Sequence, residues 1–405
     1  MFNQITTKEW DKVSYQTLGL NQEHAKKFQK FLEEKQLTHA LDFGLEGITT
    51  CAHVGIIRFA DFQLNILPKI IGEEDSLCLE NLMFMLRYTR KLEIHSMDSA
   101  EISQTKQPFL EVLIAHYANI LLNALQRHIP HQYETQEDNL PTVKGRILFA
   151  KNHLVNAANL ARTYCQFDEF TPDNLLNQTL KFVSHALQKL TSVSQTRQKL
   201  LKINAVYEDV TLRPVAYAET QKIILNRNQA MFKEPLELAQ MFLQHSTISL
   251  HNQTFTNLAI LFDMNKLFEE FVATALEKAF PGQVQTQKSR IIIDSIGGCA
   301  NTSYSIRPDI LFQNDTIIDT KYKILDLPNN KPSEADIYQM LTYNRFFNCR
   351  NIILCYPTFK QNYSRAIIFK EGASHVSIAT LNIHSRLTEN YIYKILSKIF
   401  KLTDK

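Results

Sequence analysis

The chain has 405 residues, a formal net charge of +3, a hydrophobic content of 44%, 10 glycines and 12 prolines. This length exceeds that of one small domain and predicts two or three domains, with one boundary in the 240s to 250s. The low glycine and proline content argues against long disordered linkers, and the weak net charge means that any contact with nucleic acid must come from local patches.

The sequence also bears on the compartment and on cysteine chemistry. No stretch reaches the roughly 18 consecutive apolar residues of a membrane-spanning helix, and the first residues lack a basic-then-apolar leader. We therefore expect a cytoplasmic protein without membrane contact. The six cysteines are scattered without a CxxC pair, which argues against a disulfide framework and against a zinc or iron-sulfur site.

The first third of the chain mixes short helices and strands. Residues 21–34 have helical spacing, with one side that carries His24, Phe28 and Phe31. Two β-rich runs, 56–59 and 63–67, flank Asp61 and predict a hairpin. This alternation predicts an α/β N-terminal region.

The middle of the chain, from Leu77 to about Leu190, has a mainly helical pattern without an internal repeat. The C-terminal region differs, because strands alternate with helices there. We predict a helix over 261–280, strands near 290–294, 304–312 and 316–323, a helix over 334–347 and a strand over 351–356. This order predicts a mixed sheet with helices packed on its faces.

The predicted fold class is therefore α+β or α/β with several domains. We expect a mixed α-β domain over 1–100, a mainly helical domain over 101–250 and a sheet domain over 251–405.

A hairpin predicted in the C-terminal region places three charged side chains on one face. Asn314-Asp315 is a turn signal, and Asp309 and Asp319 each lie five positions from Asn314, so they face each other across the strands. Lys321 follows Asp319 by two positions and shares its face. Phosphodiester hydrolysis needs carboxylates that hold a divalent cation and a group that stabilises growing negative charge. The pattern predicts a metal-dependent nuclease site.

The alternative interpretation is a solvated strand face. Against it, Asp319 lies in the apolar run Ile317-Ile318-Asp319-Thr320, and aspartate is disfavoured in strands. Two facing aspartates also repel each other unless a cation or a lysine compensates. These observations favour a metal site over a surface patch.

The two flanking helices add three candidates. Glu269, on the preceding helix, is either a further carboxylate ligand or an ordinary surface charge. Gln339 and Tyr343 lie four residues apart and so share one face of the following helix. They either position the attacking water or a phosphate, or they fill space in the core or on the surface.

These residues together carry a recognisable pattern. Pro308-Asp309, Asp319-Thr320-Lys321, and Gln339 with Tyr343 resemble the signature of PD-(D/E)XK nucleases with its QxxxY extension. The resemblance implies a restriction-endonuclease-like domain with a central mixed sheet flanked by helices. It also implies that Asp309, Asp319 and the Thr320 carbonyl hold the metal, with Glu269 as a candidate further ligand, and that Lys321 neutralises developing charge. Hard oxygen ligands favour Mg²⁺ or Mn²⁺ over zinc.

The wider chain resembles the McrC family, the nuclease subunits of McrBC-type restriction systems for 5-methylcytosine. No single N-terminal segment is diagnostic, but the order of several is. They are Gly55-Ile56-Ile57-Arg58, Leu67-Pro68-Lys69-Ile70, Val143-Lys144-Gly145-Arg146, the run 165–173 with Asn177, Met264 to Phe271, Arg307-Pro308-Asp309, and Ile318 to Lys323.

The resemblance implies a division of labour. The N-terminal region docks on an McrB-like hexameric AAA+ GTPase and stimulates its hydrolysis, while the partner recognises modified double-stranded DNA. The chain has no GxxxxGK[ST] phosphate loop, which fits a subunit that depends on a separate motor. Two alternatives stay open. One is a stand-alone PD-(D/E)XK repair or recombination nuclease, and the other is a non-catalytic activator of an AAA+ GTPase.

Overall fold

The fold comes from a computed structural model, which describes residues 3–69, 75–89, 108–249, 253–293, 304–313, 315–323, 331–349, 351–358, 364–367 and 375–382. Gly297 and Gly298, a turn signal between the strands predicted near 290–294 and 304–312, and Asn314 of the predicted hairpin turn lie outside the described residues.

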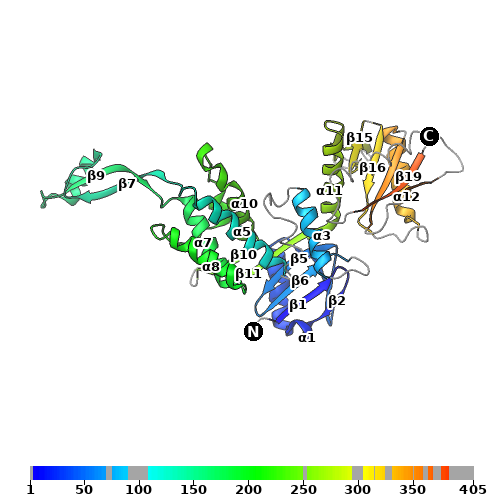
Figure 1. The fold of residues 1–405 in the computed structure, drawn as a ribbon, viewed down its shortest axis with the longest axis horizontal. Helices are drawn as coiled ribbons and strands as arrows, with labels where there is room; N and C mark the ends of the chain where they lie inside the picture. The colour runs from blue at the N-terminus through cyan, green and yellow to red at the C-terminus, as the bar shows by residue number, and fades with distance from the viewer. Residues whose placement is uncertain are drawn as a thin grey trace. The chain divides into compact units, whose positions relative to one another are not determined.

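Helices and strands alternate irregularly along the described chain (Figure 1). The helices are α1 (Tyr15–Leu18), α2 (Gln22–Glu34), η1 (Thr38–Ala40), α3 (Asp75–Tyr88), α5 (Phe109–Leu125), α6 (Phe149–Val155), α7 (Leu175–Leu190), α8 (Ser194–Val206), α9 (Tyr217–Thr220), η2 (Arg227–Phe232), α10 (Lys233–Gln244), α11 (Met264–Ala279) and α12 (Glu334–Phe347).

The strands divide among several sheets. They are β1 (Asn3–Lys8), β2 (Lys12–Ser14), β3 (Leu41–Phe43), β4 (Gly47–Thr50), β5 (His53–Phe59), β6 (Phe62–Leu67), β7 (Gln132–Leu140), β8 (Arg146–Ile147), β9 (Thr163–Thr171), β10 (Ser246–Ser249), β11 (Thr254–Asp263), β12 (Val284–Thr286), β13 (Arg290–Ile293), β14 (Tyr304–Ile306), β15 (Ile310–Phe312), β16 (Thr316–Thr320), β17 (Asn351–Thr358), β18 (Ser364–Ile367) and β19 (His375–Asn382).

The N-terminal elements agree with most of the sequence predictions. Helix α2 begins after Asn21, whose side chain accepts a hydrogen bond from the backbone of His24, as an N-cap residue does. Phe28 and Phe31 are buried, whereas His24, in the first turn of the helix, is exposed. Strands β5 and β6 are neighbours in a sheet with the order β1-β6-β5-β11-β10, as the hairpin predicted.

The chain divides into two compact units. Unit 1 comprises Met1–Asn3, Ile56–Gln63 and Gln107–Ile260, and unit 2 comprises Gln4–Gly55, Leu64–Lys106 and Leu261–Lys405. The three consecutive domains expected from the sequence stay a prediction.

In unit 1, helices α5, α7, α8 and α10 pack on one another. Their apolar faces contribute the fully buried aromatic side chains of Tyr117, Phe182 and Phe242. The hydroxyl of Tyr117 donates a hydrogen bond to the Leu180 carbonyl at 3.0 Å, which satisfies its polar end inside the core. The predicted helical character of this region is therefore present over 109–125 and 175–190, and a further helix follows over 194–206.

Between those helices, residues 132–171 form a projecting β-structure, which we call the arm. Strands β7 and β9 pair antiparallel over nine residues each, and β8 pairs with the other edge of β9 (Figure 1). The helical pattern predicted through this range is wrong for the three strands, although α6 within the arm is helical. Both strands are rich in charged and polar side chains and carry little of the apolar alternation by which a half-buried strand is recognised.

In unit 2, the C-terminal strands form a six-stranded sheet with the order β12-β15-β16-β17-β19-β18 among the described residues. β16, β17 and β19 run parallel, and β15 is antiparallel to β16. The predicted strand over 304–312 is two strands, β14 and β15, because the chain leaves extended pairing at Arg307, Pro308 and Asp309. The predicted mixed sheet is confirmed.

A helix covers each face of this sheet. Leu311, Ile317 and Ile352 project to the face that α12 covers, where they share a core with Met340 and Tyr343. Phe312, on the other face by strand alternation, contacts the ring of Phe280 at the end of α11. The mixed α and β fold class is therefore confirmed at this coarse level. No helix among the described residues is long and apolar enough to cross a membrane.

Candidate active site

The predicted hairpin has the predicted register. Ile310 pairs with Ile318, Leu311 with Ile317, and Phe312 with Thr316, and this register, continued one step beyond β15, places Asp309 opposite Asp319. Gln313 turns the chain with a positive φ of 50°. Because strand side chains alternate between faces, Asp319 and Lys321 continue the face of Ile317, toward α12.

The two aspartates have different surroundings. Oδ2 of Asp309 accepts hydrogen bonds from the backbone nitrogen and from the hydroxyl of Thr320, each at 2.7 Å. Asp319 is fully buried, and burial, together with the nearby Asp309 carboxylate, raises its pKa to about 6 against the opposing charge of Lys321. The sheet therefore holds two acidic groups close together at the end of β16.

Lys321 compensates one of these charges. Its ammonium lies 2.6 Å from Oδ2 of Asp319 as an ion pair. Among the described residues, neither oxygen of Asp319 accepts a hydrogen bond of good geometry. Burying a carboxylate is costly unless its oxygens are satisfied, so Asp319 keeps a strong capacity to bind another donor or a cation.

A chain of hydrogen bonds runs from Lys321 along α12. Nζ of Lys321 donates to Oε1 of Gln339 at 2.9 Å, Nε2 of Gln339 donates to the Tyr343 hydroxyl at 2.8 Å, and that hydroxyl donates to the Arg307 carbonyl at 3.1 Å. Burial and the Asp319 carboxylate raise the pKa of Tyr343 to about 12, so its hydroxyl stays protonated at neutral pH. Gln339 and Tyr343 thus orient the lysine.

Glu269 approaches the site from α11. Burial, followed by the Asp309 carboxylate, raises its pKa. Its Oε1 accepts a hydrogen bond from Nε2 of Gln287 at 3.3 Å, and the backbone nitrogen of Gln287 donates to the Asp309 carbonyl at 3.0 Å. Gln287 therefore joins Glu269 to Asp309, and no local sequence pattern marks it.

The structure adds two further charged residues beside the site. Asp336, on α12, is buried and pairs with Lys323 at 3.4 Å. Burial raises the pKa of Asp336, but hydrogen bonds from Ser333 and Lys323 outweigh it, so the net shift is downward. Its negative charge contributes to the raised pKa of Asp319. In the sequence, Asp336 is marked only by the N-cap pattern Ser333-x-x-Asp336, which indicates the start of a helix and not a site.

The strand that carries the site is also held from the N-terminal part of unit 2. The Tyr322 hydroxyl donates to Oε2 of Glu9 at 3.3 Å, and the backbone nitrogen of Lys69 donates to the same oxygen at 3.0 Å. Burial raises the pKa of Glu9 to about 7. Its Oε1 has no hydrogen-bond partner among the described residues. Glu9 is thus a further buried acid close to the site, in addition to Asp319 and Asp336.

The donor set fits a hard divalent cation in its chemistry. Asp309, Asp319 and a backbone carbonyl offer oxygens, and the buried, unsatisfied carboxylate of Asp319 would gain from a positive charge. Within the described residues, no group of three or more His, Cys, Asp or Glu side chains is arranged to hold a metal ion. The two aspartates therefore form the minimal carboxylate pair, and the ligand role of Glu269 stays a prediction.

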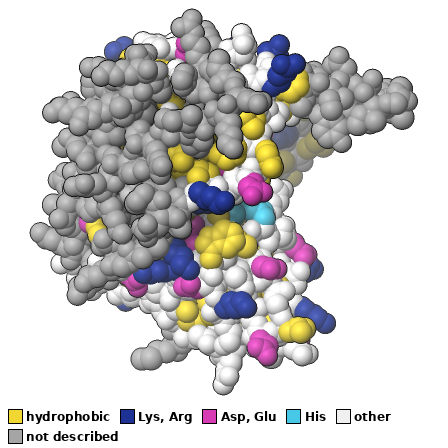
Figure 2. All heavy atoms as spheres, turned by 90° about the vertical axis from the view of Figure 1, so that its right-hand side faces the viewer, with side chains coloured by type: hydrophobic (Ala, Val, Ile, Leu, Met, Phe, Trp, Pro, Cys, Tyr) yellow, Lys and Arg dark blue, Asp and Glu magenta, His cyan; other side chains and the backbone are white. Residues whose placement is uncertain are grey.

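Positive and negative side chains are interspersed on the molecular surface shown in Figure 2. On the face in Figure 2, the coloured Lys and Arg side chains lie among Asp, Glu and hydrophobic side chains and form no continuous basic surface where the residues are described. This agrees with the weak net charge of +3. Contact with a nucleic acid would therefore depend on short local groups of cations.

The arm has a different surface. It exposes large apolar side chains whose burial would stabilise a contact with another protein. They are Tyr133, Val143, Phe149, Leu154, Val155, Leu160 and Phe170, of which Leu160 is 97% exposed.

Comparison with known proteins identifies the family. The family model of the McrBC 5-methylcytosine restriction system component matches residues 48–357. No curated protein sequence matches the chain. A chain in the refined half-complex of a tetradecameric assembly of Thermococcus gammatolerans McrB AAA+ hexamers with bound McrC has a similar fold, with a TM-score of 0.76 and 17% identity over 98% of this chain and 100% of that one.

A second solved structure, the Thermococcus gammatolerans McrBC complex, contains a chain with a TM-score of 0.54 and 20% identity, over 68% of this chain and 88% of that one. At such low identities the two likenesses show the fold alone, and the family match confirms the resemblance seen in the sequence. The chain therefore belongs to the family of McrBC 5-methylcytosine restriction system components.

Proposed function

We propose that this chain is the DNA-cutting, McrC-type subunit of a modification-dependent restriction system and hydrolyses phosphodiester bonds with a divalent cation, Mg²⁺ or Mn²⁺. The observation that carries the proposal is the meeting of Asp309, Asp319 and Lys321 at one end of β16, with Lys321 held 2.6 Å from Asp319. A buried carboxylate whose pKa is raised by burial and by a second carboxylate nearby, as that of Asp319 is, is typical of a functional site.

The residues divide the chemical work between them. Asp309 and Asp319, with the Thr320 carbonyl, hold the cation, and Glu269 is a candidate for a further ligand through water. A cation bound there supplies Lewis-acid stabilisation of the charge on the scissile phosphate. Lys321 places a positive charge beside the same phosphate oxygens. Gln339 and Tyr343 hold the lysine in position, because their hydrogen bonds restrict its flexible side chain.

The wider arrangement supports the assignment of the C-terminal domain to the PD-(D/E)XK nucleases. The site lies where an antiparallel hairpin, β15 and β16, joins the parallel pair β16 and β17, with α11 and α12 on opposite faces. Asp309 precedes the first hairpin strand, whereas Asp319 lies in the second and Lys321 directly after it. This placement brings all three groups to one edge of the sheet.

We further propose that the chain acts with a hexameric AAA+ GTPase, stimulates its GTP hydrolysis and receives modified double-stranded DNA from it. The McrC in the similar structure is bound to McrB AAA+ hexamers. The arm adds an observation from this chain, because its exposed apolar side chains, among them Phe149 and Leu160, fit a protein partner. The arm thus joins the N-terminal region, 1–100, as a candidate docking surface.

The test is reconstitution of the full chain with the AAA+ GTPase from its own system, a methylated plasmid, GTP and Mg²⁺. The unchanged chain should cut the plasmid, and Asp309→Ala and Lys321→Ala should lower the cutting rate by about a hundredfold or more. Lys202→Ala, a change at an exposed lysine on α8 outside the arm and the N-terminal region, is the matched control and should cut normally.

The GTPase rate separates this proposal from its main competitor. Both site variants should stimulate GTP hydrolysis as well as the unchanged chain does, because the arm and the N-terminal region are intact. Normal cutting by Lys321→Ala would refute the nuclease assignment. Stimulation of GTP hydrolysis without any cutting by the unchanged chain would identify it as a non-catalytic activator.

A further inference from the structure

A pocket of about 490 Å³ lies in the C-terminal sheet domain, on the face that α12 covers. The side chains that line it come from β12, from the segment that leads from β12 into β13, from β15, and from the end of α12 and the residues just after it. They are Gln285, Lys288, Ser289, Arg290, Leu311, Phe347 and Cys349. This volume lies within the range of roughly 300 to 1,000 Å³ that is typical of pockets for small organic groups.

The pocket adjoins the candidate active site through one short segment. Gln287 binds the Asp309 carbonyl through its backbone nitrogen and Glu269 through its side chain. The next residue, Lys288, already lines the pocket. Gln287 has a positive φ of 54°, which turns the chain between the two places.

The strand and the helix make the same connection. Leu311, in the pocket wall, pairs with Ile317, which lies two residues before Asp319 on the same face of β16. On α12, Tyr343 belongs to the site, and Phe347 follows it by one helical turn, with the two rings in edge contact at 6.5 Å between centroids. The pocket thus lies beside the candidate active site on the same face of the sheet.

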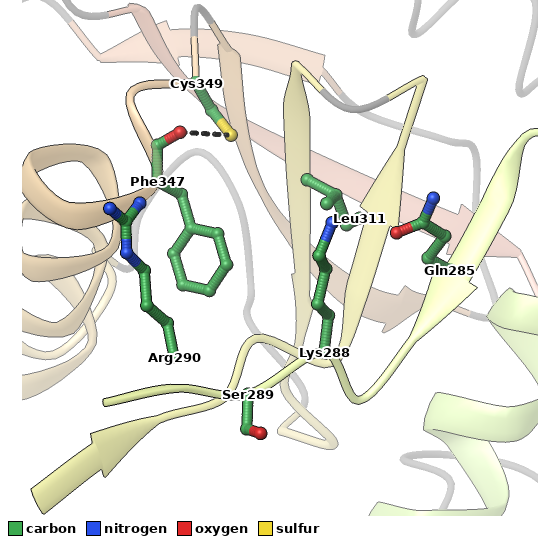
Figure 3. A pocket seen from close by; sticks show the side chains of 7 residues that line it. All are labelled: Gln285, Lys288, Ser289, Arg290, Leu311, Phe347 and Cys349. Carbon is green, nitrogen blue, oxygen red and sulfur yellow. Dashed lines mark hydrogen bonds between the residues drawn. The ribbon is translucent and has the colours of Figure 1, made fainter. Parts of the chain in front are cut away.

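The lining combines positive charge with an aromatic face. In Figure 3 the ring of Phe347 lies between the side chains of Arg290 and Lys288. Arg290 is fixed by a hydrogen bond from its guanidinium to the Phe346 carbonyl. Burial, followed by the Asp315 carboxylate, raises the pKa of the Cys349 thiol, which is therefore neutral. Two cations and five neutral side chains give the pocket a positive character.

We propose that this pocket binds one unstacked nucleotide of the DNA strand that is cut, with its base against Phe347 and its phosphates on Lys288 and Arg290. Every base has an aromatic face that stacks on such a ring, and cations beside the ring match the phosphates on either side of the base. The proposal rests on the proposed nuclease function, and it adds that the substrate is locally unpaired next to the site. The pocket would hold the strand in register while the neighbouring phosphate is cut.

The test is equilibrium binding of the full chain to a short fluorescent single DNA strand and to the corresponding blunt duplex, measured by fluorescence anisotropy. EDTA is present to remove divalent cations, so that no cutting occurs. Phe347→Leu should weaken binding of the single strand by about tenfold, the effect of one lost base stack. Lys288→Ala should weaken it and lower the slope of log affinity against log salt by about 0.7, the share of one phosphate contact.

Matched variants guard against a folding artefact. Phe347→Tyr keeps the aromatic face and should bind like the unchanged chain, and Lys30→Ala changes an exposed lysine on α2 and should leave the salt slope unchanged. Lys288 is exposed, so Lys288→Ala reports on the pocket even if Phe347→Leu fails to fold. Full single-strand affinity in both Phe347→Leu and Lys288→Ala would overturn the proposal. So would a loss in Lys288→Ala with full affinity in a folded Phe347→Leu, because phosphates alone would then be bound.

Parallel cutting assays with the AAA+ partner keep this proposal separate from the nuclease assignment. If Lys321→Ala abolishes cutting while Phe347→Leu and Lys288→Ala bind and cut normally, the pocket proposal fails and the nuclease assignment stands. If the unchanged chain never cuts while both pocket variants lose single-strand affinity, the nuclease assignment fails and the pocket binds a nucleotide for another purpose.

Discussion

The candidate active site and the arm use opposite physical means. At the site, a sheet edge buries carboxylates, and Asp319, fully inaccessible, has a pKa of about 6. The arm instead exposes apolar side chains to solvent, among them Leu154 on α6, which is 83% exposed, and Leu160 between α6 and β9, which is 97% exposed. Buried charge and exposed apolar surface both cost stability in the isolated chain.

The two regions suit different kinds of partner. Unsatisfied carboxylate oxygens attract a cation, because a positive charge offsets their burial. Exposed apolar side chains attract another protein, because association removes them from water. A mutation in the arm should therefore impair partner binding, whereas a mutation at the site should impair cutting. Four predictions address the two regions.

The largest effect is expected from the arm. Leu154→Asp combined with Leu160→Asp should weaken the affinity for the AAA+ partner by about ten- to a hundredfold, since each residue is a candidate for the buried centre of an interface. Cutting and GTPase stimulation should fall together at low concentration and recover when the chain is in excess. Titration of both activities checks this, and a loss of cutting alone would contradict it.

A second change tests the backbone of the arm. Gly145 has a φ of 70°, and a Cβ there would lie 2.4 Å from the Gln166 carbonyl oxygen. Gly145→Ala should therefore destabilise the arm by about 1–3 kcal/mol from its conformation alone, with more from the clash. Limited proteolysis within 132–171 measures it, and Gly19→Ala, also at positive φ but without close neighbours, is the control for conformation without a clash. Equal protease resistance of the arm in both variants would contradict the prediction.

The third prediction concerns the buried acid near the site. The folded chain raises the pKa of Glu9 from 4.5 to about 7, so it binds that proton more tightly than the unfolded chain does. Glu9 therefore contributes stability at low pH that is lost as the pH rises from 4.5 through 7, by about 2 kcal/mol between pH 5 and pH 8.

Glu9→Gln removes this titration. Urea unfolding followed by the fluorescence of Trp10, the one tryptophan of the chain, should show a stability that falls less with pH in the variant than in the unchanged chain. The gap between the two curves should widen above pH 5. Parallel curves would show that Glu9 titrates normally.

The smallest effect is expected from Tyr343→Phe. It deletes the hydrogen bonds that link Gln339 to the Arg307 carbonyl and so loosens the support of Lys321. One such bond contributes about 1 kcal/mol, so the cutting rate should fall roughly fivefold while the affinity for DNA changes little. Gln339→Ala removes the direct contact with Lys321 and should lower the cutting rate further. A Tyr343→Phe variant that is as slow as Lys321→Ala would mean that Tyr343 contacts the substrate itself.

The sequence alone was enough to predict the hairpin between β15 and β16 and its register, which places Asp309 opposite Asp319. It also predicted α12 and the shared face of Gln339 and Tyr343. These features follow from local rules, since a turn signal centres a hairpin and side chains repeat every two residues in a strand. The family, too, was visible in the order of its segments.

The arm, the contacts of Gln287 and the pocket around Phe347 depend on tertiary packing and could not be predicted from the sequence. Strands β7 and β9 lie far apart in the sequence and lack apolar alternation, so no local pattern predicts their pairing. Gln287 and Glu269 meet because one strand and one helix pack together, and Lys288, Leu311 and Phe347 meet for the same reason. Contacts between distant segments depend on packing, which a short window of sequence does not encode.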